Sequence, residues 1–480
     1  MPRGHATPSG SRRHSRTRRS KPALRLDLRF GQFPIVAALF VVCALGGGSS
    51  RIDSLSLLYL RPMAVAALVV ILFLSRRTDL RLVRVPLTLL AVLAGWMAIQ
   101  LIPLPPAVWS TLPFRTTVLH GLQAIGVEIG WRPVSLTPDL TLNSLIALVV
   151  PAALLVGSSS LSARQQIWLS VIVVAAAAVS IFVEVAQVAG GPDSPFYLYA
   201  VSNVGTPSGL FANRNHQAAF LACVLPLLAV TAHPRLSGRH ALPLAWGYLG
   251  FALMAVIAVV ATGSRTGSLI AAVLLIYTLF TSISYVVPNP KHRRVVTAAV
   301  ALGGIALLIG MMLLGRAASL DRLSGFDATS EQRLKALPTL VQMFEQFILT
   351  GTGFGSFDPV FRIMEPDSLL HATFFNHAHN DWLELAITGG LPALVVLAVF
   401  CVWVIRNTIT RFRQRSSPMT ILARAGGLIV LALGAASLTD YPLRTPLLSA
   451  LLALAVGWLS RSPDQEDGSK GNVANAHLSA

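Results

Sequence analysis

Residues 377–405 read HAHNDWLELAITGGLPALVVLAVFCVWVI, a polar cluster followed at once by a long apolar segment. The apolar part, residues 382–405, is long enough to cross the hydrocarbon core of a bilayer as a helix. The polar part places two imidazoles, an amide and a carboxylate where that helix is expected to begin. Apolar packing does not require these residue types, so the cluster is the first candidate for chemistry: His377, His379, Asn380 and Asp381.

Similar apolar runs recur along the whole chain of 480 residues, which is 54% hydrophobic and only 12% charged. Their lengths lie near twenty residues, the length of a membrane-spanning helix. We therefore predict an all-α polytopic membrane protein with about twelve spans. The predicted spans are 33–50, 56–75, 85–102, 140–157, 167–189, 212–231, 241–261, 266–287, 295–314, 382–405, 420–439 and 445–460.

Basic residues alternate between the loops, and this alternation predicts the orientation of the chain. The net charge is +18. Most basic residues lie in the N-terminal tail and in every second loop, which we place in the cytoplasm together with both termini. The outer loops are then 103–139, 190–211, 262–265, 315–381 and 440–444.

The basic tail, residues 1–32, is expected to contact anionic lipid headgroups, so membrane lipids are partners. Nucleic acid is not expected, because no aromatic residues alternate with the arginines to stack on bases. The first span is preceded by about thirty residues, too many for an ordinary signal peptide, and we expect it to remain as an anchor. Cys43, Cys223 and Cys401 all fall inside predicted spans, so no outer disulfide is expected.

The predicted organisation is one membrane domain with an external cap. Spans one to nine occupy residues 33–314, a large periplasmic capping loop occupies 315–381, the last three spans occupy 382–460, and residues 461–480 form a second cytoplasmic tail. Within the loop, an apolar stripe at three- and four-residue steps predicts an amphipathic helix lying on the membrane or on other helices; it comprises Leu334, Leu337, Val341, Phe344 and Ile348. Pro338 is expected to bend or interrupt this helix.

Two other loops have a composition that favours structure over chemistry. Gly351, Gly353 and Gly355 could be mistaken for a nucleotide loop, but the strand and helix of a βαβ unit are not expected around them. A tight turn is the preferred interpretation. The loop 103–139 is rich in proline and has tryptophans near its ends, which favours a stiff interfacial connection with no assigned chemistry.

Arginine marks two further outer sites. One is Asn213-Arg214-Asn215-His216 at the start of the sixth span, and the other is Thr262-Gly263-Ser264-Arg265 between the seventh and eighth. Each arginine alone could be a snorkelling anchor. Two cations and an imidazole pair on one face instead indicate a pocket for an anion, and the planar donors of arginine fit diphosphate well. Arg333 in the capping loop could add a third cation.

The histidine cluster permits other interpretations. The spacing His377-x-His379-x-Asp381 occurs in binuclear metal hydrolases, but that motif requires a further His where this chain has Trp382, so we expect no metal. A purely structural pair at the helix start is also open, with Asp381 well placed to cap the helix.

Glu184 is the only acid deep in the predicted membrane region, one turn from Gln187. It could be a proton site or a hydrogen-bonded contact between helices. The second is preferred, because no buried cation is evident beside it.

The order of these motifs resembles the O-antigen ligase and O-antigen polymerase superfamily over roughly residues 200–460. The matching pieces are Phe211-x-Asn213-x-Asn215-His216, Thr262-x-Ser264-Arg265, Arg333-Leu334, Gly351-x-Gly353-x-Gly355-x-Phe357, His379-Asn380-x-x-Leu383 and Gly389-Gly390-Leu391-Pro392. The resemblance implies a bacterial inner-membrane glycosyltransferase that takes a glycan from an undecaprenyl-diphosphate carrier on the periplasmic side. The acceptor would be lipid A-core or another glycan, and no cofactor or metal is implied.

The resemblance also implies roles for individual residues. His379 matches the essential histidine of the family and Arg265 its essential arginine, while Arg214 and Arg333 fall where further arginines occur. Arg214 departs from many relatives, which have another residue between the two asparagines, and His377 matches a less regular position. The chemistry is consistent with these roles, because a diphosphate leaving group needs cations and the acceptor hydroxyl needs a base.

We therefore predict His379 as general base, kept neutral by nearby arginines, with Arg265 and Arg214 as diphosphate clamps. Asn380 and Asp381 would orient the base, and direct attack would invert the anomeric centre. Asn213, Asn215 and His216 are secondary candidates. The motifs do not separate a ligase from a repeat-unit polymerase. A transporter or flippase for a lipid-linked glycan is the alternative from another class, and it would use Glu184 or a cytoplasmic-side cavity instead.

Overall fold

The structure is a computed structural model that describes residues 31–74, 80–232, 241–287, 289–299, 302–303, 328–370 and 375–461. These residues are mostly helical, with very little strand. The helices are α1 (Gln32–Gly46), α2 (Leu57–Leu74), α3 (Arg84–Gln100), α4 (Pro106–Trp109), α5 (Arg115–Ala124), α6 (Pro138–Ala147), α7 (Val149–Ser159), α8 (Ala163–Gly190), α9 (Arg214–Ala232), α10 (Ala241–Ala261), α11 (Arg265–Val286), α13 (Ala328–Phe347), α14 (Phe357–Met364), α15 (Asp381–Arg413), α16 (Pro418–Ala436) and α17 (Pro446–Ser460).

The remaining regular elements are short. Three 3₁₀ turns, η2 (Gly191–Asp193), η3 (Asp367–Leu369) and η4 (Pro442–Arg444), occur in loops. The two strands described are β1 (Pro103–Leu104) and β2 (Arg132–Pro133), which pair antiparallel with Pro103 opposite Pro133. The all-α prediction is therefore confirmed for the described part of the chain.

Six helical segments in the described residues are long and apolar enough to cross a membrane. They are Leu57–Leu74, Pro138–Ser159, Ala163–Asp193, Arg265–Ile283, Asp381–Arg413 and Pro418–Ala436. Shorter apolar helices occur at four further predicted spans, Gln32–Gly46, Arg84–Gln100, Trp246–Ala261 and Pro446–Ser460. The predicted span 295–314 lies mostly outside the described residues. The number of spans therefore stays a prediction.

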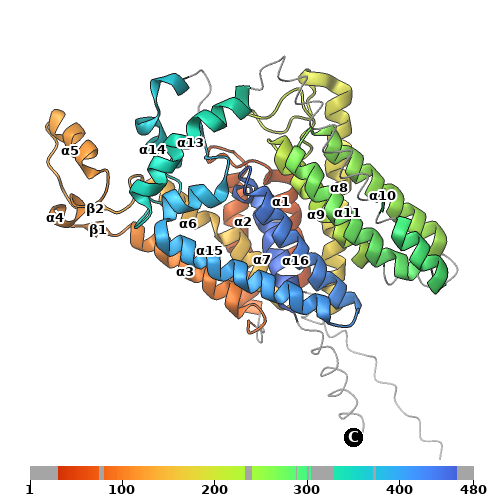
Figure 1. The fold of residues 1–480 in the computed structure, drawn as a ribbon. Coiled ribbons are helices and arrows are strands. Elements are labelled where there is room, and N and C mark those ends of the chain that lie inside the picture. Colours follow the sequence, from red (N-terminus) through yellow and green to blue (C-terminus); the bar gives the residue numbers. More distant parts are fainter. Residues whose placement is uncertain are drawn as a thin grey trace, which may run out of the picture.

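Helix α9 lies at the centre of one half of the bundle. It packs against α8, α10, α11 and α16, and its residues from His216 to Thr231 are buried. Its first turn carries Arg214, Asn215, His216 and Gln217, which explains why it is less apolar than its neighbours. In the other half, α17 packs against α7, α16 and α1 (Figure 1). The polar start of α9 is thus held in a fixed position by protein on several sides.

Glu184 and Gln187 join α8 to the segment around the start of α9. The Gln217 amide donates to Oε2 of Glu184 at 2.8 Å, and Oε1 of Gln187 accepts from the backbone N–H groups of Ser208 and Gly209, each at 2.8 Å. These contacts agree with the hydrogen-bonded interhelix role that we preferred for Glu184.

Helix α13 confirms the predicted helix in the capping region, although its buried face differs from the predicted stripe. Ala336, Leu340, Met343 and Phe347 are buried, whereas Leu337 and Val341 are 48% and 43% exposed. The buried set is shifted by one residue because α13 packs against α15 through that face. Pro338 was expected to bend or interrupt the helix; it lies inside the continuous helix α13, so the interruption is wrong and the bend stays a prediction.

The glycine-rich turn after α13 packs against a kink in α15. Gly390 has φ 64° and interrupts the helical geometry of α15, and Gly351 has φ 74° in the turn. The Gly353 N–H donates to the Thr388 carbonyl at 3.0 Å, and the buried Gln100 side chain donates to the carbonyls of Thr350 and Thr388. Glycine is therefore required because the backbone of the turn lies directly against the backbone of α15. This agrees with the predicted structural turn.

Replacing Gly351 by alanine is expected to destabilise the protein by about 1–3 kcal/mol. A Cβ there would lie 2.2 Å from the Thr388 carbonyl oxygen, on a residue with positive φ. The measurement is the thermal unfolding midpoint of the detergent-solubilised protein. Gly95→Ala is the control, because a Cβ at Gly95 meets no atom within 4 Å and alanine favours the helix α3. Equal midpoints for the two variants would contradict the assigned packing.

Candidate functional site

Asp440, in the loop between α16 and η4, connects two of the three polar segments that the sequence singles out. Its Oδ2 accepts from the Asn215 amide at 2.7 Å and from the Asn213 amide at 3.3 Å. Its Oδ1 lies 3.3 Å from Nδ1 of His379 and accepts from the backbone N–H of Tyr441 at 3.0 Å. The side chain is only 5% exposed, so this buried carboxylate links the start of α9 to the histidine cluster.

The charge state of Asp440 determines the tautomer of His379. Burial alone would raise the pKa of Asp440, but the hydrogen bond from His379, the nearby imidazoles and the Asn215 amide hold it below its usual range. An ionised carboxylate can only accept, so Nδ1 of His379 carries the shared proton and Nε2 is the basic nitrogen of the neutral ring. Because the pKa is lowered on folding, the stabilisation from this pairing is complete above the ordinary carboxyl pKa and is lost as the pH falls through the lowered value.

The backbone of His379 adopts an uncommon conformation. Its φ is +50°, and within the described residues only one other non-glycine residue, Phe114, has positive φ. Such a conformation costs on the order of 1 kcal/mol or more and persists only where surrounding contacts impose it. Here the imposed geometry turns the imidazole toward Asp440 while Asn380 starts the next helix.

Tyr441 lies among all three imidazoles of the site. Its ring centroid is 4.3 Å from that of His377, 5.0 Å from that of His379 and 5.2 Å from that of His216. His216 is 1% exposed, and its Nε2 lies 4.0 Å from Oδ1 of Asp440. The segment Asp440–Tyr441 therefore gathers residues from α9 and from the start of α15 around one ring and one carboxylate.

A second buried network lies beside the first and involves Arg444. Its guanidinium contacts Oδ1 of Asp381 at 3.0 Å and Oε1 of Glu384 at 2.9 Å. Nδ1 of His377 lies 3.1 Å from the same Glu384 oxygen, and the Ala378 N–H donates to the other at 2.9 Å. Burial alone would lower the pKa of Arg444. The neighbouring carboxylates of Glu384 and Asp381 raise it by more, so the net effect is a raised pKa. This network fixes the short loop after α16 against the first turn of α15.

Removal of the Arg444 charge is expected to lower stability by about 3 kcal/mol, because two largely buried carboxylates would lose their cation. Thermal unfolding of Arg444→Met in detergent measures this effect. The matched control is Arg362→Met, whose ion pair with Asp358 is exposed and contributes little. A midpoint for Arg444→Met as high as that of the control would show that the network is dispensable.

The residues at the start of α15 have contacts that differ from the expected ones. Asn380 caps the helix, since its side-chain oxygen accepts from the N–H groups of Trp382 and Leu383, each at 3.1 Å. Asp381 was expected to suit that cap, but its carboxylate instead binds Arg444 and accepts from the Ser437 hydroxyl at 3.3 Å. Asp440 contacts Nδ1 of His379, and the orienting role that we predicted for Asn380 and Asp381 stays a prediction.

Arg214 and Arg265 both begin helices on the side of the histidine cluster. Arg214 follows Asn213 at the start of α9, and a Cβ at Gly263 would lie 3.4 Å from its Nη1. Arg265 is the exposed first residue of α11, after Ser264, whose hydroxyl accepts from the Gly267 N–H. The neighbouring Thr266 hydroxyl lies 3.0 Å from that of Thr439, next to Asp440. The two arginine segments therefore border the Asp440 loop.

Two other expectations concern Arg333 and metal. The backbone of Arg333 belongs to α13, but its side chain lies outside the described residues. Among the side chains that the structure describes, no group of three or more His, Cys, Asp or Glu residues has an arrangement suited to a metal ion. His377 and His379 instead turn Nδ1 toward different carboxylates, those of Glu384 and Asp440.

A comparison with protein families addresses the same part of the chain. Residues 249–398 match the O-antigen ligase family. The match covers about a third of the chain and includes Arg265, Arg333 and the cluster from His377 to Asp381. It confirms the resemblance to an O-antigen ligase-like superfamily. A comparison with curated proteins finds no match.

The O-antigen ligase match and the apolar helices together support a multi-pass bacterial membrane protein and a glycosyltransferase-like enzyme. The family suggests lipid-linked glycan and glycan acceptor substrates. The segment 440–444 lies beyond the matched residues, and the sequence patterns predict an outer loop there without indicating a role for it. Its composition carried a signal: Asp440, Tyr441 and Arg444 are concentrated in a very short connection between two apolar helices.

Proposed function

We propose that this O-antigen ligase-like protein transfers a glycan from an undecaprenyl-diphosphate carrier to an acceptor hydroxyl on the periplasmic side of the inner membrane. The observation that carries the proposal is the pairing of His379 with the buried carboxylate of Asp440, beside the segments that hold Arg214 and Arg265. A base with a fixed tautomer and nearby cations is what transfer from a lipid diphosphate requires.

In the proposed reaction, the acceptor oxygen attacks the anomeric carbon from the side opposite the diphosphate. The new carbon–oxygen bond forms as the bond to the diphosphate oxygen breaks, and the diphosphate leaves with the bonding electron pair. Nε2 of His379 takes the hydroxyl proton. The carboxylate of Asp440 stabilises the resulting imidazolium through Nδ1–H, and inversion at the anomeric carbon follows from the single displacement.

Arg265 and Arg214 have the electrostatic role in this proposal. Both stand at helix N-termini, where the backbone dipole adds to their positive charge. The developing charge on the leaving diphosphate needs such donors, and arginine can bind two phosphate oxygens at once. The buried network of Asp440 with Asn213 and Asn215 positions the backbone of Arg214 between the two amides.

Arg265→Gln is expected to lower kcat/KM for the glycan transfer by about 10² to 10³-fold, because it removes a charge from the leaving group. The assay uses purified full-length protein in nanodiscs, a radiolabelled undecaprenyl-diphosphate glycan and two acceptors in separate reactions, lipid A-core and a second carrier-linked repeat. Arg362→Gln is the control, because its guanidinium is exposed on α14 and pairs with Asp358. Transfer to only one acceptor distinguishes a ligase from a polymerase.

Absence of transfer to both acceptors, with movement of the intact lipid across the membrane instead, would refute the proposal in favour of a flippase. Addition of EDTA is expected to leave the transfer rate unchanged, since the proposed chemistry uses only side chains of the chain. A rate that falls with EDTA and recovers with a divalent cation would contradict this mechanism.

A further inference from the structure

Residues 103–133 form an arm beside the helical bundle. The pairing of β1 with β2 closes its base, and α4 and α5 lie between the strands. Figure 1 shows the arm extending sideways from the ends of α3 and α6, on the same side as α14. The arm takes no part in the site described above, so its exposed surface requires another explanation.

The arm has a small packed centre of its own. Trp109 is 2% exposed, and its Nε1 donates to the Pro133 carbonyl at 2.9 Å. The guanidinium of Arg115 lies 4.9 Å from the Trp109 ring and that of Arg132 lies 5.9 Å from it, while Arg115 also donates to the Val134 carbonyl. The two cations around one buried ring give the arm a defined shape.

A second contact fixes the arm to the capping helices. Phe114, which has φ 67°, packs edge to face against Phe347 of α13 with the ring centroids 5.7 Å apart. The strained backbone of Phe114 places its ring in this contact at the start of α5. The orientation of the arm is therefore coupled to that of α13.

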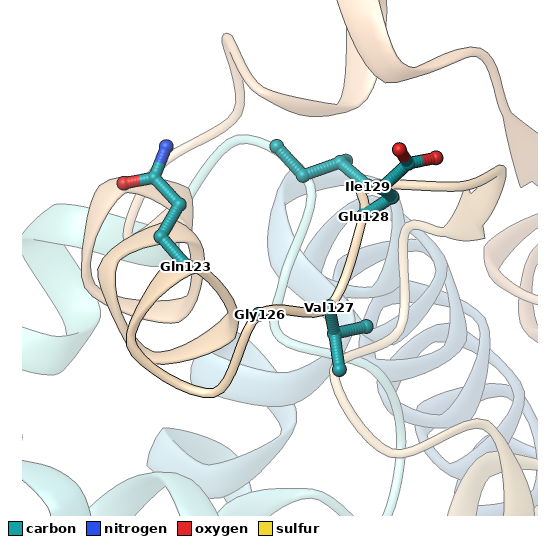
Figure 2. A pocket seen from close by; sticks show the side chains of 5 residues that line it. All are labelled: Gln123, Gly126, Val127, Glu128 and Ile129. Carbon is teal, nitrogen blue, oxygen red and sulfur yellow. The ribbon is translucent and has the colours of Figure 1, made fainter.

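The tip of this braced arm exposes large apolar side chains. Ile125 is 72% exposed and Val127 43%, while Trp131, which is 67% exposed, lies directly before β2 at the base of the arm. Figure 2 shows Val127 and Ile129 on the loop after α5, beside an open hollow of about 460 Å³ that Gln123 and Glu128 also line. Large apolar side chains that are exposed close together indicate a contact with an apolar environment, so we expect one at the tip.

The lipid-facing surface of α3 leads directly into the arm. Val92, Ile99 and Ile102 are about half exposed, at 51%, 49% and 54%. Helix α3 has 17 residues and a length of about 25 Å, close to the thickness of the hydrocarbon core. The arm begins at Pro103, directly beyond the end of this helix, and its base is therefore at the membrane boundary on the side of the site.

We propose that the tip of the arm lies in the membrane interface on the site side, with Ile125 and Val127 inserted among the lipid headgroups and the upper acyl chains, and with Trp131 in the same layer at the base of the arm. Tryptophan favours this layer, and the base of the arm adjoins the lipid-facing surface of α3. Through Phe114 and Phe347, the inserted arm sets the height of α13 above the bilayer. The inference does not depend on the proposed reaction.

Spin labels on the full-length protein test the location of the tip. Cysteine is introduced at Ile125 or Val127 in a Cys401→Ala background, in which the two remaining cysteines, Cys43 and Cys223, are buried. Each nanodisc holds one copy of the protein in anionic phospholipid. The measured quantity is the ratio of collisions of the label with oxygen to collisions with a water-soluble nickel chelate.

Two further label positions calibrate the ratio. Val92→Cys reports the lipid-facing surface of α3, and Glu345→Cys reports the exposed surface of α13. We expect the ratio at both tip positions to be severalfold higher than at Glu345 and to approach that at Val92. A tip ratio equal to that at Glu345 would place the tip in water and overturn the proposal. All four positions are exposed, so the labels leave the packed centre unchanged.

Discussion

His379→Ala is expected to reduce kcat/KM for glycan transfer by about 10² to 10⁴-fold, the usual effect of removing a positioned general base. The imidazole is the proposed proton acceptor, and its Nδ1 is already engaged by Asp440. Donor binding should change little, because the arginine segments remain in place. The measurement is the initial rate of transfer in nanodiscs as a function of donor concentration.

The backbone of His379 requires a second variant, because alanine does not favour its φ of +50°. His379→Asn retains a residue that tolerates this conformation but provides no base at neutral pH. Both variants should be equally slow, and added imidazole should restore part of the rate in His379→Ala. His120→Ala, exposed on α5, is the control. A fully active His379→Asn enzyme would assign His379 a structural role instead.

Asp440→Asn should have an effect of similar size, about a thousandfold on kcat, although Asp440 need not touch either substrate. The asparagine cannot stabilise an imidazolium, and its amide can present a donor to Nδ1 of His379, which favours the wrong tautomer. In that orientation the remaining carbonyl oxygen still accepts from Asn213 and Asn215, whereas the flipped amide would leave these two residues without their acceptor. The rate profile with pH separates this positioning role from simple loss of fold.

In the wild type, the low pKa of Asp440 keeps the carboxylate ionised throughout the pH range in which the enzyme is assayed. Asp440→Asn should therefore shift the pH profile of kcat as well as lower its height, whereas a purely structural defect would lower all points equally. Asp193→Asn, exposed in η2, is the control. An unshifted profile with an unchanged unfolding midpoint would exclude the assigned role of Asp440.

The sequence predicted most of the long helices in the described part of the chain, because their apolar runs are close to the length of a span. The sequence singled out the histidine cluster as a candidate because polar groups are costly at the start of such a helix, and its role stays a prediction. It did not predict Asp440, since the contacts from this residue to Asn215 and His379 cross 225 and 61 positions of the chain. Local patterns contain no information on such distant pairing.

The capping helix shows a different limitation. Periodicity predicted α13, but the predicted stripe contains Leu337 and Val341, which are largely exposed, while the buried face contains Ala336 and Met343. A helix with apolar residues on more than one face can pack in several rotations about its axis. Contact with the neighbouring helix α15 selects one of these rotations. The rotation of a helix about its axis is thus a tertiary property.

The kink at Gly390 divides α15 into a short segment, Asp381–Gly389, and a longer apolar one. Because the short segment is fixed at Glu384 by Arg444 and at Gly389 by Trp96, whose indole donates to the Gly389 carbonyl at 2.7 Å, it acts as a spacer of defined length. One inserted residue would turn His379 by about 100° around the helix axis while raising it by only about 1.5 Å. The length of the spacer therefore affects the rotation of the imidazole about the helix axis much more than its position along that axis. Insertions of a single residue should be less tolerated than insertions of a whole turn.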